Sequence, residues 1–214
     1  QQIPQYFDSV DIHDYSGDIS GYVEQVHGWM NSAGHPSYPV WLSEWGTYRS
    51  QYNSVSFDLS LVQNLIRGSR PSNDYVTGSH VFSLYDWAGN KGAFQSFQGL
   101  IATDGTRTPG YYAMRLGIRG LQGARPTFQS TCSASSLAAI TTRDSAGHIY
   151  LLVVNGATTT YSVDADLSAL LASGSGTMWQ FDASHMDVVA GNPTLNSGHA
   201  TFTMPGNAAV LLKF

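Results

Sequence analysis

The sequence predicts an α/β region followed by an all-β region in one chain of 214 residues. Before residue 121, segments with strand-like alternation take turns with segments of helical spacing, which indicates βα units on a parallel sheet. From Arg125 onward, short β-branched and aromatic segments are separated by Gly, Asn, Ser and Pro, which is typical of an antiparallel β-sandwich. We therefore expect two domains, residues 1–121 and residues 122–214.

The first βα unit begins with a strand over residues 8–15. Val10 and Ile12 are its apolar positions, and polar side chains alternate with them up to the end of the strand at Asp11, His13 and Tyr15. A turn at residues 16–18 follows. Apolar residues then recur at helical spacing until residues 33–36 end the helix, namely Tyr22, Val23, Val26, Trp29 and Met30.

The second unit has a short strand from Val40 to Ser43, with Glu44 at its exit. A helical pattern runs from Leu59 to Ile66, and we expect its N-cap at Ser56 or Asp58. The third unit has a strand over residues 76–87 and a helix over residues 109–121, with Pro109 in the first turn.

The all-β region contains seven predicted strands and one short interruption. The interruption is a single helical turn over residues 167–171. The strands are expected at residues 127–131, 137–142, 149–154, 161–165, 178–181, 199–204 and 209–214. We expect three tryptophans in the core: Trp29, Trp41 and Trp179.

Composition excludes several classes of partner. The net charge is −5 and no basic stripe is present, so neither nucleic acid nor an anionic membrane is an expected partner. No apolar segment approaches the roughly 20 residues that span a bilayer. Residues 1–5 do not resemble a signal peptide. Only 12% of residues are charged, a balance common among secreted carbohydrate-active proteins, so we expect an extracellular protein.

Other chemistries find little support in the motifs. Six histidines lie without metal-ligand spacing, at His27, His35, His80, His148, His185 and His199, so we expect no metal. A phosphate-binding loop and a serine nucleophile elbow are both missing, and no cofactor is expected. The single cysteine, Cys132, rules out an internal disulfide and is either a buried thiol or a link to another chain.

The three strand ends carry the candidate functional groups, because parallel βα folds place function at the carboxyl ends of their strands. These ends are residues 13–15, 44–46 and 86–87. They combine a carboxylate, hydrogen-bonding groups and two indoles, and sugars bind through the same combination of aromatic stacking and polar contacts. Glu44 is one of only two glutamates in the chain. The alternative interpretation of Glu44 is a solvent-exposed acid at a strand end.

The strand-end segments resemble a known family. Residues 11–15, 41–46 and 82–87 look like strands six, seven and eight of the (β/α)8 barrel of clan A retaining glycoside hydrolases. Residues 99–112 resemble the passage into the final helix of that lineage. In layout the chain is most similar to family 39 and family 30 enzymes, which carry a C-terminal β-sandwich. The resemblance implies that the chain is the C-terminal portion of such an enzyme.

The resemblance also implies a role for each strand-end residue. Glu44 would be the nucleophile of a double-displacement reaction, Tyr15 would hydrogen-bond Glu44, and His13 would contact the sugar or Tyr15. Trp87 would be the platform under the sugar ring. The weaker candidates for substrate contacts are Asp86, Trp45 and Asn90.

One part of the family's machinery is missing from the sequence. A retaining mechanism needs a second carboxyl group about 5 Å from the first, and in this clan it is a glutamate that follows an asparagine. No Asn-Glu pair occurs here, and Glu24 is expected on a solvated helix face. We therefore expect a second polypeptide, or a missing N-terminal piece, to supply barrel strands one to five and the acid/base.

Two other interpretations remain open. The first is a non-catalytic, lectin-like carbohydrate-binding protein derived from such a hydrolase. The second is a structural sandwich module with a vestigial βα half. Three βα units leave open sheet edges and an unfinished core, so either one requires a partner or extensive repacking.

Overall fold

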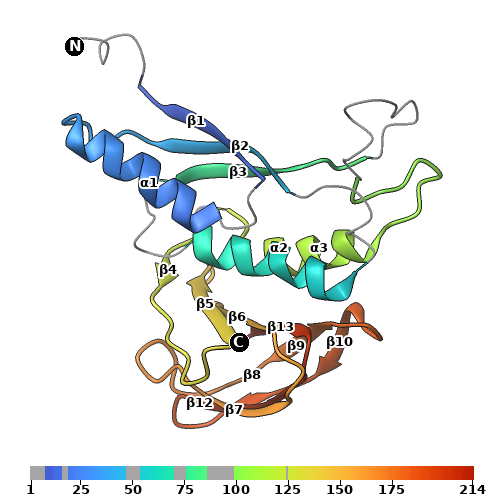
Figure 1. Cartoon of the computed structure of the whole chain (residues 1–214). Coiled ribbons are helices and arrows are strands. Elements are labelled where there is room, and N and C mark those ends of the chain that lie inside the picture. Colours follow the sequence, from blue (N-terminus) through green and yellow to red (C-terminus); the bar gives the residue numbers. More distant parts are fainter. Residues whose placement is uncertain (1–7, 16–18, 47–53, 70–75, 86–98, 124) are drawn as a thin grey trace.

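The fold is a stack of four layers. The structure is a computed structural model that describes residues 8–15, 19–46, 54–69, 76–85, 99–123 and 125–214. Figure 1 shows a parallel sheet above two helices, a larger antiparallel sheet below them, and a small two-stranded sheet at the bottom. The helix layer thus contacts a sheet on each side.

The parallel sheet has the order β1-β2-β3, with β1 at Val10–Asp14, β2 at Val40–Gly46 and β3 at Val76–Phe82. Helices α1 (Ile19–Ser32), α2 (Val55–Gly68) and α3 (Pro109–Leu121) alternate with the strands and all lie on one side of the sheet (Figure 1). This is the expected order of elements. β3 ends at Phe82, short of the predicted 76–87.

The helix-facing side of this sheet is apolar. Ile12, Val40 and Leu42 point into a cluster that also contains helix residues, which are Val23, Val26, Met30, Leu61 and Met114. The opposite side carries the polar positions of β1 and β2 and no described helix covers it. Within the part of the chain that the structure describes, helices therefore cover the parallel sheet on one face only.

Helix α2 begins earlier than predicted. Its N-cap is Ser54, whose hydroxyl makes no capping hydrogen bond to the backbone. Asp58 lies inside the first turns with a fully buried side chain, and neither carboxylate oxygen has a hydrogen-bond partner among the described residues. Burial raises the pKa of Asp58 to about 8. The expected cap at Ser56 or Asp58 is wrong, because Asp58 faces the protein interior instead of the helix end.

The antiparallel sheet has six strands in the order β10-β9-β13-β6-β5-β4. The smaller sheets pair β12 with β7 and β11 with β8. The strand bounds are β4 Thr127–Phe128, β5 Leu137–Arg143, β6 Ile149–Asn155, β7 Tyr161–Asp166, β8 Gly174–Ser175, β9 Thr177–Phe181, β10 Met186–Gly191, β11 Thr194–Leu195, β12 His199–Met204 and β13 Ala208–Lys213.

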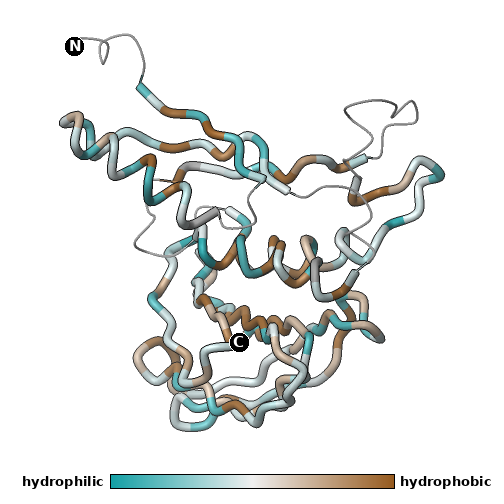
Figure 2. Tube along the Cα trace, in the orientation of Figure 1, coloured by the Kyte–Doolittle hydropathy of each residue, from teal (hydrophilic) through white to brown (hydrophobic). Residues whose placement is uncertain are grey.

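Strand β6 is buried along its whole length because both of its faces are covered. Leu151 and Val153 face the β12-β7 sheet, whereas Leu152 and Val154 face α2 and α3. The neighbouring strand β13 divides its side chains between the same two clusters. Figure 2 shows the resulting run of apolar residues through the six-stranded sheet. The sheet therefore serves as the centre of two cores.

Most predicted strands of this region are present, with differences at their ends. Strand β4 is shorter than the expected 127–131, and β10 was not predicted. The helical turn at residues 167–171 is confirmed by hydrogen bonds from the N–H groups of Leu170 and Leu171 to the carbonyl of Leu167.

An ion-pair cluster connects α3 to the six-stranded sheet. The Asp187 side chain, on β10, is fully buried and accepts hydrogen bonds from Arg115 and from Arg119, the latter at 2.9 Å. Arg119 also lies over the ring of Trp179. The Asp187 ion pairs and the apolar cluster shared by α2, α3 and the six-stranded sheet both join residues from the two sides of the predicted domain boundary at residues 121/122. Packing is therefore continuous across this boundary.

The expectation of three core tryptophans is wrong for two of them. Trp29 is 59% exposed on α1, and Trp41 is 38% exposed on the uncovered face of β2, whereas Trp179 is half-buried. Glu24 is exposed, as expected, and Cys132 is half-buried. Among the described residues, no helix is both long enough and apolar enough to cross a bilayer.

Candidate functional site

The predicted strand-end groups of β1 and β2 meet at one place. The Tyr15 hydroxyl donates a hydrogen bond of 2.8 Å to Oε2 of Glu44. Nδ1 of His13 lies 3.4 Å from the same oxygen. The His13 side chain is 53% exposed and that of Glu44 is 36% exposed, so solvent reaches the group. Two residues near the end of β1 and one in β2, about 30 positions later in the sequence, thus form one polar cluster.

A β-bulge in β2 explains why Glu44 faces this cluster. Ile12 pairs with Leu42 but His13 pairs with Glu44, so β2 contains one extra residue, Ser43. The same extra residue appears against β3, where Leu42 pairs with Ser79 and Trp45 with Val81. Regular strands alternate their faces, so Ser43 and Glu44 would point to opposite sides without the bulge. With it, both side chains reach residues of the uncovered face of the sheet.

One aromatic ring contacts the cluster, and two others pair with each other on the neighbouring strands. The ring of Phe82 lies edge-on to Tyr15, with centroids 6.5 Å apart. The ring of Trp41 lies 6.3 Å from that of His80, and it packs over Gly78, where any Cβ would come within 2.7 Å of the indole. Sequence reasoning missed Trp41, His80 and Phe82. The alternation of Trp41 with buried Leu42 was the available signal for Trp41.

Trp45 does not belong to the site in this structure. The bulge turns it to the helix side, where its side chain is 1% exposed in the apolar cluster, and its indole N–H has no hydrogen-bond partner among the described residues. A sugar could not reach this ring without unpacking the core, so the expected contact is corrected. Asp86, Trp87 and Asn90 lie outside the described residues.

The cluster provides a hydrogen-bonded carboxylate rather than a metal site. Among the described residues, no group of three or more His, Cys, Asp or Glu side chains could hold a metal ion. A phenol that donates to one carboxylate oxygen stabilises the charged form and fixes the orientation of the group. A carboxylate oriented in this way can act as a nucleophile or stabilise a nearby positive charge.

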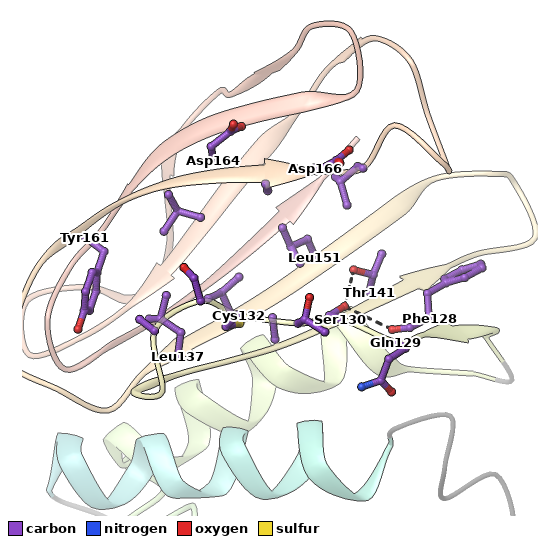
Figure 3. Close-up of a pocket in the computed structure, with 18 of the residues that line it drawn as sticks. Phe128, Gln129, Ser130, Cys132, Leu137, Thr141, Leu151, Tyr161, Asp164 and Asp166 are labelled. Carbon is purple, nitrogen blue, oxygen red and sulfur yellow. Dashed lines mark hydrogen bonds between the residues drawn. The ribbon is translucent and has the colours of Figure 1, made fainter.

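A separate hollow of about 780 Å³ lies in the all-β region, away from Glu44. Figure 3 shows side chains of β7 on one side, including Asp164 and Asp166, and the segment around Cys132 on the other. Its floor is apolar, with Leu137 and Leu151. The strand-end cluster, in contrast, lies on an open sheet face.

Comparisons with known proteins reveal similarity of fold. No protein-family model matches the sequence, and no curated protein matches it. Among solved structures, a GH30 endoxylanase from Clostridium papyrosolvens C71 superposes with a TM-score of 0.73 at 12% identity, covering 96% of this chain and 48% of that one. A GH39 β-xylosidase from Caulobacter crescentus gives a TM-score of 0.67 at 17% identity, with coverage of 97% and 51%.

Related folds extend to a third glycoside hydrolase family. A GH51 arabinofuranosidase from Xanthomonas axonopodis pv. citri gives a TM-score of 0.68 at 16% identity, with coverage of 98% and 53%. The resemblance to families 30 and 39 is thus confirmed at the level of fold. The chain spans about half the length of these structures, which is consistent with a C-terminal portion. Fold likeness at such identities leaves function to be argued from the site.

Proposed function

We propose that this chain is the nucleophile-bearing portion of a retaining glycoside hydrolase that acts on β-linked sugars. Strands β1, β2 and β3 would be strands six to eight of a (β/α)8 barrel that leads into the β-sandwich. The observation that carries the proposal is the hydrogen bond from Tyr15 to Glu44 at the exits of two parallel strands. The carboxyl ends of parallel strands are where barrel enzymes place their reacting groups.

In the proposed reaction, Glu44 attacks the anomeric carbon and forms a glycosyl-enzyme intermediate that water then hydrolyses. Tyr15 keeps the carboxylate oriented before attack, since its O–H donates to Oε2. His13 lies on the same side and is exposed enough to hold a sugar hydroxyl. Trp87 remains the proposed platform for the sugar ring, with Asp86 and Asn90 as further contacts.

The general acid/base would come from outside this chain. The only other glutamate, Glu24, is exposed on α1. A second polypeptide, or an N-terminal part of a longer protein, would bring barrel strands one to five and the missing carboxyl group. The half-length match to the solved structures and the uncovered face of the parallel sheet support this division. We also propose that the protein acts outside the cell.

Substitution of Glu44 tests the nucleophile. In the active preparation, Glu44→Gln should lower turnover of an aryl β-xyloside by at least about 10³-fold, because the covalent step is lost. The xyloside is the first probe because solved structures with this fold include a β-xylosidase and an endoxylanase. Glu24→Gln is the matched control and should leave turnover unchanged. Azide should restore activity to Glu44→Gly, and full activity of either Glu44 variant would remove it from this role.

The proposed second component can be sought directly. Denaturing electrophoresis with mass spectrometry of the native protein should reveal either a longer chain or a second polypeptide that carries an Asn-Glu pair. An active, homogeneous monomer of 23.1 kDa would contradict the proposal.

Sugar binding without hydrolysis is the second candidate function. The observation that favours it is that the sequence contains no second glutamate near Glu44. Calorimetry of this chain with xylo-oligosaccharides would then give saturable binding that Trp41→Ala weakens, since Trp41 offers its ring on the uncovered face. Turnover by the same preparation would exclude a purely binding role.

A further inference from the structure

The β2 bulge creates a backbone group that needs a partner. Ser43 has no partner residue in β1 or in β3, whereas Leu42 is paired with both strands and Glu44 is paired with β1. The N–H of an extra residue in a bulge is left out of the regular ladder and takes a partner elsewhere, either a side chain or water. Bulges are also rare between parallel strands. The bulge at Ser43 is therefore expected to have a stabilising hydrogen-bond partner outside the ladder.

Asp11 supplies that stabilisation from β1. Its Oδ1 accepts a hydrogen bond of 3.3 Å from the backbone N–H of Ser43, and its Oδ2 accepts one of 2.8 Å from the Ser43 hydroxyl. Both carboxylate oxygens therefore bind the one residue that the ladder leaves out. The hydrogen bond from the Ser43 hydroxyl lowers the pKa of Asp11 below its usual value, and burial, which acts in the opposite direction, does not cancel this effect. Asp11 is therefore charged at neutral pH.

We call the two hydrogen bonds from Ser43 to Asp11 the Asp11–Ser43 clamp. The position of Asp11 on β1 connects this clamp to the candidate site. Asp11 and His13 occupy alternate positions of β1 and share one face, and Tyr15 continues this alternation one residue after the strand ends. Asp11 contacts Ser43, while Tyr15 and His13 contact the next residue, Glu44. One face of β1 thus determines the direction of two successive side chains of β2.

We propose that Asp11 is a positioning residue that maintains the β2 bulge at Ser43 and so directs Glu44 toward Tyr15. The role of Asp11 in the bulge depends only on the contacts above, whereas its effect on turnover rests on the proposed function of Glu44. If β2 instead alternated regularly through Ser43, Glu44 would turn to the side of Leu42, and Trp45 would turn to the uncovered face.

Asp11→Ala tests the clamp without any need for activity. Hydrogen exchange at the Ser43 amide should become about tenfold faster or more, because a hydrogen bond to a charged group is lost. The ¹³Cζ resonance of Tyr15 should also shift toward its value in Glu44→Gln, since the phenol loses its charged carboxylate acceptor in both variants. Unchanged exchange at Ser43, or a Tyr15 resonance that stays at its wild-type position, would overturn the proposal.

The chain offers a close control for this substitution. Asp166 accepts hydrogen bonds from the N–H and hydroxyl of Ser168 at 3.0 and 2.6 Å, the same pairing on an exposed strand of the all-β region. Asp166→Ala should speed exchange at Ser168 and leave Ser43 and Tyr15 unchanged. Ser43→Ala is a milder variant in case Asp11→Ala does not fold. It removes one of the two hydrogen bonds and should shift the Tyr15 resonance by a smaller amount in the same direction.

Kinetics separate this proposal from the proposed function. In an active preparation, Asp11→Ala should lower kcat about 10- to 100-fold while KM changes less than about twofold, because a misplaced nucleophile slows the covalent step more than binding. Asp11→Asn keeps an acceptor oxygen and should recover part of kcat. If Glu44→Gln is fully active, the proposed function fails, and the exchange and resonance measurements still decide the role of Asp11.

Discussion

Strands β2 and β6 have the same length but opposite surroundings. All seven residues of β6 are buried, because a sheet covers one face and two helices cover the other. In β2 only Val40, Leu42 and Trp45 are buried, and the remaining positions face the uncovered side. A strand with both faces packed against other elements, such as β6, stabilises the fold but exposes no side chain that could bind or react with a ligand. A strand that is covered once has room for an ionisable group such as Glu44.

The same contrast distinguishes the two sheets. The six-stranded sheet is packed on both faces within this chain, so the all-β region has a complete core. The parallel sheet has three described strands, and β1 and β3 are each paired on one side only. Unpaired sheet edges are sites where further strands add. The parallel sheet is therefore the region that gains most from an additional part of a barrel.

The largest expected effect concerns Asp58, in the helix layer between the sheets. Its pKa is raised to about 8 in the folded chain, so the unfolded chain releases this proton at lower pH than the folded one. The stability contribution of protonated Asp58 is complete below about pH 4 and falls by about 1.4 kcal/mol per pH unit until about pH 8. Asp58→Asn should remove this decline. Urea unfolding at several pH values, compared between wild type and variant, measures the difference.

A similar pH dependence in both proteins would contradict the burial of Asp58. Carboxylates with lowered pKa values, such as Asp182, act in the opposite direction, but they are common to both proteins and cancel in the comparison.

A cavity in the doubly covered sheet should have the next largest effect. Leu152→Ala, in the middle of β6, removes a side chain that packs against α2 and α3. We expect a loss of about 2–5 kcal/mol in the free energy of unfolding, as for large-to-small changes in a packed core. Chemical denaturation followed by tryptophan fluorescence measures it. A loss below about 1 kcal/mol would show that this layer is less tightly packed than the structure indicates.

The smallest of the three effects should come from the ion pairs between α3 and β10. Asp187→Asn keeps a residue that tolerates the positive φ of 55° at this position but removes the charge that Arg115 and Arg119 bind. Both arginines are partly exposed, so the expected loss is about 1–3 kcal/mol instead of the full cost of a buried charge. A salt titration of stability should be flatter in the variant. Equal salt dependence in both proteins would exclude a role for this charge.

Local signals in the sequence were sufficient for several elements. The helix at Pro109–Leu121 was predicted at both ends, since a proline opens it and apolar residues recur at helical spacing. The strand before Glu44 was predicted from a short apolar segment, although β2 continues to Gly46 and Glu44 lies inside it instead of at its exit. The meeting of Tyr15 with Glu44 followed from the resemblance to glycoside hydrolases and is present in the structure.

Long-range contacts account for what the sequence did not predict. The bulge depends on a contact between Asp11 and Ser43, 32 positions apart, which no local pattern reveals. Strand β10 escaped prediction because its pairing with β9 is irregular, and Asp187 interrupts the alternation with a left-handed backbone. Asp58 looked like a helix cap because acids favour the first turn. Its burial arises from tertiary packing around α2, which the local sequence does not reveal.

The extra residue in β2 has a consequence for how such chains can change by insertion and deletion. Because Ser43 is the extra residue, loss of its codon would restore strict alternation and still leave Glu44 opposite His13, with Leu42 and Trp45 on the helix side. Most single-residue deletions turn the following side chains to the other face of a strand. Here the deletion would make the strand more regular and keep Glu44 on its face, so β2 tolerates at Ser43 a change that elsewhere in the strand would displace the site.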